Sequence, residues 1–133
     1  MEALVTVHEN ETPAQVTTAA ALDELLRLAS DEARARGMLN VIFIEARDRN
    51  TLMMVVGGDE TVLGFTYGYR KPRYYESRGA AAQDDPVMTC HASLTHPIAF
   101  SRRCVIPLET GMRALHEFVE TGALPTCVSW AET

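Results

Sequence analysis

Three shortages limit what this 133-residue chain can be: it has few basic residues, few cysteines and no long apolar run. Twelve Lys and Arg residues stand against eighteen Asp and Glu residues, a net charge of −6, so direct binding to nucleic-acid phosphates is disfavoured because it needs a basic surface. Three cysteines, an odd number, favour free thiols in a reducing cytosol over a disulfide framework. No apolar run reaches the roughly eighteen residues of a membrane span, and the N-terminus lacks the basic start and apolar core of a signal peptide. We therefore expect a cytoplasmic protein that neither spans a membrane nor binds nucleic acid directly.

Recognised catalytic and metal-binding motifs are also missing. Residues 90–93, Cys-His-Ala-Ser, come closest to a zinc deaminase, whose motif needs a His-x-Glu and a later Pro-Cys-x-x-Cys. Ser93 stands where the Glu is needed and no Cys-x-x-Cys exists, so we interpret this string as a strand of alternating exposure. No nucleophile elbow is present, and Gly57-Gly58 lacks the following lysine of a phosphate-binding loop. The other possible zinc ligands match no recognised spacing: Cys90, His91, His96, Cys104 and Cys127. We predict no catalysis, no metal and no cofactor.

The apolar patterning predicts one α+β domain over residues 1–133. Apolar residues at helical spacing predict one helix over about 18–36 and a second over about 108–121. Residues 41–47 and 51–56 are apolar on both faces, which is typical of strands covered on both sides. Further strands are predicted near the two termini and at residues 61–70, 87–94 and 104–106, and a long loop at 70–86. The short connections imply a mostly antiparallel sheet of five to seven strands, with both helices mainly on one face.

The last twenty-two residues carry the most specific pattern in the chain. The second helix places one apolar stripe at Leu108, Met112, Leu115, Phe118 and Val119. Gly122 can take the left-handed conformation that ends a helix, and Pro125 follows where a helix can no longer continue. A short terminal strand then holds the only tryptophan, Trp130, which we expect to be a core anchor.

This C-terminal segment resembles the closing signature of a family of polymorphic-toxin immunity proteins, immunity protein family one. Its members tend to end with Phe-x-x-Thr-Gly and then x-x-Pro-x-x-Val-x-Trp. The matching positions here are Phe118, Thr121, Gly122, Pro125, Val128 and Trp130. Three earlier segments are similar to family motifs in the same order: Leu22–Ala29, Gly57–Phe65 and Tyr74–Gly79. The resemblance covers most of the chain after about residue 16.

The resemblance implies an immunity protein that binds a cognate bacterial toxin domain and occludes its active site. Members similar to this chain often neutralise deaminase-fold toxins that act on nucleic acids or nucleotides. An acidic inhibitor suits such a toxin, because a domain that grips a polyanion presents a basic groove. The alternative is a small α+β enzyme or small-molecule-binding module with a pocket between sheet and helices. Carboxylates or histidines converging on a cavity would favour that alternative.

We expect toxin contact at two acidic turns and at the tyrosines of the 70–86 loop, close together at one end or edge of the sheet. Tyr is enriched at protein interfaces, whereas the paired acids could instead be ordinary solvated turn residues. Basic residues in the same loop depart from the family pattern and argue against a purely acidic surface: Arg70, Lys71, Arg73 and Arg78. The predicted toxin-binding residues are Asp59, Glu60, Tyr69, Tyr74, Tyr75, Glu76, Asp84 and Asp85.

Overall fold

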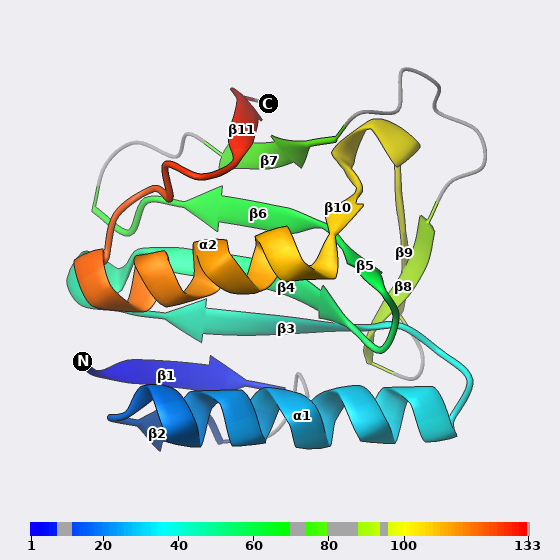
Figure 1. The fold of residues 1–133 in the computed structure, drawn as a ribbon, viewed down its shortest axis with the longest axis horizontal. Coiled ribbons are helices and arrows are strands. Elements are labelled where there is room, and N and C mark those ends of the chain that lie inside the picture. The colour runs from blue at the N-terminus through cyan, green and yellow to red at the C-terminus, as the bar shows by residue number, and fades with distance from the viewer. Residues whose placement is uncertain (8–11, 70–73, 80–87, 94–95, 133) are drawn as a thin grey trace.

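Two helices and a large sheet make up the structure, a computed structural model that describes residues 1–7, 12–69, 74–79, 88–93 and 96–132 (Figure 1). The helices are α1 (Ala19–Ala35) and α2 (Leu108–Thr121). The strands of the large sheet are β1 (Ala3–Thr6), β2 (Ala14–Val16), β3 (Asn40–Glu45), β4 (Thr51–Val56), β6 (Leu63–Thr66), β7 (Tyr74–Arg78), β8 (Met88–Ser93), β9 (His96–Phe100) and β11 (Ser129–Glu132). A separate two-stranded pair is formed by β5 (Glu60–Thr61) and β10 (Ile106–Pro107), and two 3-10 turns are η1 (Arg47–Arg49) and η2 (Arg102–Cys104).

Seven strands follow one another side by side in the order β11-β7-β6-β4-β3-β1-β2, and every neighbouring pair is antiparallel. Strand β8 joins β3 in parallel at a single position, and β9 pairs with β8. The predicted α+β class and antiparallel sheet are confirmed. The sheet has nine strands, however, where five to seven were predicted.

The prediction of a loop over residues 70–86 is wrong for residues 74–78, which form β7. The physical reason is Ser77, a polar residue at a fully buried position of this strand. Its hydroxyl accepts the Leu63 N–H at 3.0 Å and donates to the Cys104 carbonyl at 2.6 Å. A buried serine breaks the apolar alternation by which a strand is recognised.

Both helices lie on one face of the sheet, as predicted (Figure 1). Helix α1 begins where the Thr18 hydroxyl accepts the Ala21 N–H at 3.1 Å, a typical N-cap. Helix α2 ends at Gly122, whose φ of 70° is left-handed and whose N–H donates to the Phe118 carbonyl at 2.6 Å. The two helices share one core with the inner side chains of the sheet, and Phe118 packs there against Phe65 with ring centroids 5.9 Å apart.

Trp130 closes this core from the last strand. Its ring centroid lies 6.5 Å from that of Phe65, and its Nε1–H donates to the Pro125 carbonyl at 2.8 Å. Phe118 is completely buried and Trp130 is half-buried. The expected anchoring role of both aromatic residues is therefore confirmed, with Phe118 the more deeply placed.

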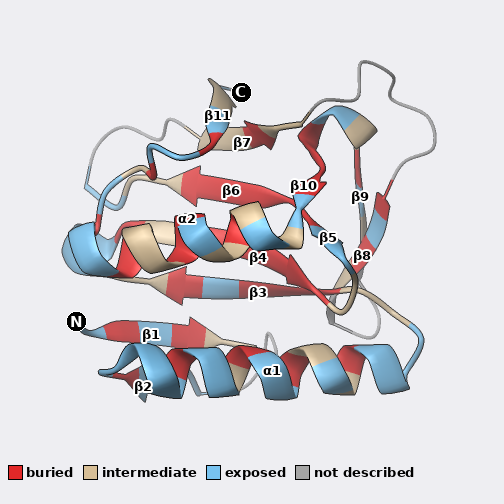
Figure 2. Ribbon diagram, viewed as in Figure 1, coloured by how far each residue is buried: buried red, intermediate tan, exposed pale blue. Residues whose placement is uncertain are grey.

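The described residues cover the opposite face of the sheet over only one half. There the β8–β9 hairpin packs a second core against β3 and β4, so the beginning of β3 and the second half of β4 are buried on both sides, whereas Phe43 in the middle of β3 is exposed (Figure 2). This core includes Val41, Met53, Val55, Cys90 and Phe100. Among the described helices, neither is long and apolar enough to cross a membrane.

Candidate functional site

The predicted contact residues are distributed over both ends of strand β6. Asp59 and Glu60 precede this strand, and Tyr69 follows it at the other end of the sheet (Figure 1). The expectation that these residues lie close together is therefore wrong for Tyr69. Glu60 and Glu76, by contrast, both contact the η2 turn, through Arg102 and Cys104 respectively. Asp84 and Asp85 lie outside the described residues.

The Asp59–Glu60 turn is exposed and already has a cationic partner. Both oxygens of the Glu60 carboxylate accept hydrogen bonds from Arg102, at 3.2 Å each. The Asp59 carbonyl accepts the Leu108 N–H at 3.0 Å, which ties the turn to the start of α2. Arg102 thus offsets one of the two charges on which the interface prediction for this turn depends.

Tyr74 and Tyr75 point to opposite faces of the sheet, because neighbouring residues of a strand alternate. Tyr75 lies half-buried on the helix side, with its ring 6.2 Å from that of Tyr67. Tyr74 lies on the other face across Gly64, where a Cβ would collide with its ring. Burial, with a smaller contribution from the nearby Glu76, raises the pKa of Tyr74 to about 12. Only Tyr74 of this pair is therefore directed away from the helix-side core.

Glu76 is held in place by Cys104. The Cys104 thiol donates to Oε2 of Glu76 at 2.9 Å, and Nη1 of Arg78 donates to the same sulfur at 3.2 Å. Burial, together with Glu76, raises the pKa of Cys104 to about 11. The thiol is therefore protonated at neutral pH and is a hydrogen-bond donor rather than a nucleophile.

Tyr74 and Glu76 belong to a larger surface, the half of the sheet that the β8–β9 hairpin leaves uncovered. Directly paired residues share a face, so the strand register defines two rows across the sheet. One row is Gln15, Leu4, Glu45, Thr51, Thr66 and Tyr74. The next row is Thr6, Phe43, Met53, Gly64, Glu76 and Ala131. We call these two rows the open sheet face.

The open sheet face combines exposed apolar side chains with negative charge. Leu4 and Phe43 are 40% and 38% exposed, which is unusual for large apolar residues in the middle of strands. The only charged members of the two rows are Glu45 and Glu76, both half-buried. Glu2 adjoins the surface, where its carboxylate accepts from Gln15 at 3.1 Å.

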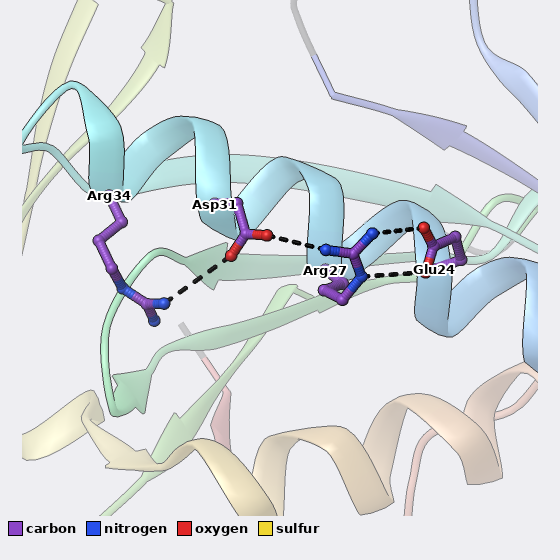
Figure 3. Close-up of polar contacts among 4 residues, drawn as sticks. All are labelled: Glu24, Arg27, Asp31 and Arg34. Atoms are coloured by element: carbon purple, nitrogen blue, oxygen red, sulfur yellow. Dashed lines mark hydrogen bonds and ion pairs between the residues drawn. The ribbon is translucent and has the colours of Figure 1, made fainter.

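The outer face of α1 is a second exposed charged surface, but its charges satisfy one another. Arg27 donates to Glu24 and Asp31 at 3.0 Å each, and Asp31 also pairs with Arg34 (Figure 3). Pairs at this helical spacing are usually solvated and contribute little. This face therefore shows no feature that requires a partner.

A cavity of about 470 Å³ lies at the C-terminal end of α1. Its described lining is Arg34, Gly37, Met38, Leu39, Gly57, Thr89 and His91. Nδ1 of His91 is buried and finds no hydrogen-bond partner within the described part of the chain. This lining includes one imidazole but no carboxylate, and in the described ranges no three His, Cys, Asp or Glu side chains are placed to share a metal ion. A single imidazole is not a catalytic constellation.

The alternative prediction of a pocket between sheet and helices meets a filled space. Large side chains from α1, α2 and the inner strands are fully buried there, among them Leu22, Leu115 and Phe118. The described middle of this layer is a packed core. A cavity of about 280 Å³ lies at its edge, lined by Met1, Glu2, Ala46, Arg47, Val119 and Gly122.

Over residues 10–132 the chain matches a family described as Immunity protein Imm1. The chain belongs to the Imm1 family. The match spans nearly the whole chain and includes the complete Phe118–Trp130 signature, so the resemblance read from the sequence is confirmed. No curated protein matches this chain. Membership of Imm1 makes it an immunity protein, whose partner is a cognate toxin protein.

Proposed function

We propose that this Imm1 protein binds the catalytic domain of its cognate toxin, covers the active site, and catalyses nothing itself. The observation that carries the proposal is the family match over residues 10–132. We further propose that the toxin is a deaminase-fold enzyme acting on nucleic acids or nucleotides, the class that the C-terminal resemblance implies.

Charge supports this class of toxin. The chain has a net charge of −6, and a toxin that holds a polyanionic substrate presents cationic side chains around its active site. Carboxylates on the inhibitor can occupy the place of the substrate's phosphates and accelerate association. Of the predicted contact residues that the structure describes, Asp59, Glu60, Tyr69, Tyr74 and Glu76 remain proposed contacts. Tyr75, which faces the helix-side core, instead supports the strand beside them.

The cysteines support a cytosolic site of action. All three are free, and Cys90 and Cys104 are buried. Burial raises the pKa of both thiols to about 11, so they remain unreactive in the folded protein. Free thiols suit a reducing compartment, and we propose that the protein protects the cytosol in which the toxin's substrate lies.

The test uses the toxin domain encoded beside this chain, because immunity proteins are typically encoded next to their toxins. Its deaminase activity is measured on single-stranded DNA, RNA and free nucleotides while this protein is added in increasing amounts. The proposal predicts deamination of at least one of these substrates and complete inhibition at one equivalent. A deaminase domain from another toxin system, which should stay active, is the control. Full activity in excess inhibitor would contradict the inhibition, and a toxin inactive on every such substrate would contradict the toxin class.

A further inference from the structure

We propose that the open sheet face is the surface on which the toxin docks, and that the toxin presents apolar and cationic side chains to it. This inference rests on the proposed function, since it assumes that a toxin domain is bound. The proposed interface is centred away from the Asp59–Glu60 turn. It includes residues that were not predicted as contacts from the sequence.

Phe43 and Leu4 are large apolar residues that lie exposed on the open sheet face. Along β3, the neighbours Ile42 and Ile44 are fully buried under the helices, whereas Phe43 between them is 38% exposed on the other face. The second core under the β8–β9 hairpin extends over Val41, Val55 and Met53, the partner of Phe43 on β4, but leaves Phe43 itself partly exposed. A partner seated beside the hairpin would therefore complete the cover of the sheet.

The composition of the rows fits a protein interface. Phe43 and Tyr74 are of the types enriched in interfaces, whereas Met53 between them is already buried in the second core. The hydroxyls of Thr6, Thr51 and Thr66 can both donate and accept hydrogen bonds. The sheet holds all these side chains in a fixed register, so little conformational freedom is lost when a partner binds.

The charge of the rows specifies the partner. Glu45 and Glu76 lie within them and Glu2 lies beside them, and the rows contain no basic residue. Among the described residues, two bases at the rim are engaged: Nε of Arg49 lies 3.9 Å from Glu45, and Arg78 donates to the Cys104 sulfur. This negative surface complements a cationic substrate groove, whereas at the Asp59–Glu60 turn Arg102 already pairs with Glu60.

The size of the surface indicates what else contributes. Seven adjacent strands span about 29 Å across the sheet, and two rows of residues span about 13 Å along the strands. The surface therefore measures roughly 400 Å², about half of the area that one partner buries in an interface of standard size. The remainder must come from the rim. Tyr69, which is 73% exposed just beyond β6, and Arg49 in the η1 turn lie at the uncovered end of the sheet. The predicted contact Tyr69 therefore belongs with this surface.

The experiment measures the dissociation constant of the neighbouring toxin domain, with its catalytic residue inactivated, against matched arginine variants. Phe43→Arg and Thr51→Arg place a bulky positive charge on the open sheet face. Leu28→Arg is the matched control, because Leu28 is a 52% exposed apolar residue on the outer face of α1. Glu60→Arg tests the competing turn. Thermal unfolding checks that each variant is folded.

We expect both open-face variants to bind about 100-fold or more weakly, and Leu28→Arg to stay within about threefold of the wild type. Glu60→Arg changes a proposed contact outside the open sheet face, so it should weaken binding, but by less than either open-face variant. Glu45→Gln should slow association and reduce its dependence on salt. Folded Phe43→Arg and Thr51→Arg proteins that bind within about threefold of the wild type would overturn the inference. Should Phe43→Arg not fold, Thr51→Arg decides alone.

The outcomes separate the two proposals. A wild-type protein that does not bind the toxin domain overturns the proposed function and this inference together. A wild-type protein that binds tightly, with binding lost only in Glu60→Arg, overturns this inference and leaves the proposed function intact.

Discussion

Asn50 joins three parts of the fold, and its replacement gives a direct test of the packing described above. The residue follows the η1 turn and is 8% exposed. Its Nδ2 donates to the Gly122 carbonyl at the end of α2 (2.7 Å), and its Oδ1 accepts the N–H of Gly68 after β6 (2.9 Å). The side chain therefore fixes the end of α2 to the uncovered end of the sheet.

Asn50→Ala removes both bonds and leaves one carbonyl and one N–H without their partner. The Gly122 carbonyl is buried, and an unsatisfied buried polar group costs about 1–3 kcal/mol, whereas Gly68 is exposed and its N–H can bond to water. We therefore expect a loss of about 1–3 kcal/mol in the free energy of unfolding, which for a domain of this size lowers the melting temperature by about 4–12 °C. Asn50→Asp keeps the acceptor for Gly68 but places an acceptor against the Gly122 carbonyl. It should be at least as destabilising as Asn50→Ala at neutral pH.

Urea unfolding followed by circular dichroism measures these losses. Gln15→Ala is the matched control, because this exposed amide makes a surface bond to Glu2. Its removal should change the free energy of unfolding by no more than about 0.5 kcal/mol. If Asn50→Ala lost as little as Gln15→Ala, the amide would not be holding the helix end, and this account of the fold would be refuted.

Three further predictions concern stability, pH and metal. Phe118→Ala should lower the free energy of unfolding in urea by about 3–5 kcal/mol. Trp130→Ala should lower it by less, because the tryptophan ring is half-buried. Equal stability of Trp130→Ala and the wild type would show that the ring does not anchor the core. Burial raises the pKa of Cys90 and Cys104 from 9.0 to about 11, so their protonated thiols stabilise the folded state below pH 9. The free energy of unfolding should therefore fall as the pH rises from 9 towards 11. Cys90→Ala should flatten that decline, and an unchanged pH profile would contradict the assignment. Protein purified without chelator should contain no stoichiometric zinc by elemental analysis, whereas one tightly held zinc per chain would contradict the binding-only mechanism.

Local signals made much of the fold predictable. The predicted start of the first helix at about residue 18 coincides with the Thr18 N-cap of α1, and Gly122 marked the end of α2. The apolar runs correctly indicated cover on both faces for most of β4 and for the beginning of β3, but not at Phe43. The missed strands β2, β7 and β9 lack such signals. Strand β2 has three residues, β7 buries Ser77, and β9 contains Pro97, a residue that usually argues against a strand.

The candidate site was less predictable because it depends on contacts between distant segments. The sequence drew attention to Tyr74 and Glu76, but it could not show that Tyr75 faces the other side, since strand β7 itself was missed. Phe43 lies in an apolar run that looks uniformly buried. Its exposure follows from how far the β8–β9 hairpin extends over the sheet, which no local pattern of β3 encodes.

The most direct measurement of the central claim is survival of cells that express the neighbouring toxin domain together with this protein or its variants. The account predicts that the wild type and Leu28→Arg restore growth, and that Phe43→Arg, expressed and folded to the same level, does not. Failure of the wild type to protect would contradict the immunity role. Full protection by Phe43→Arg would contradict docking through the open sheet face.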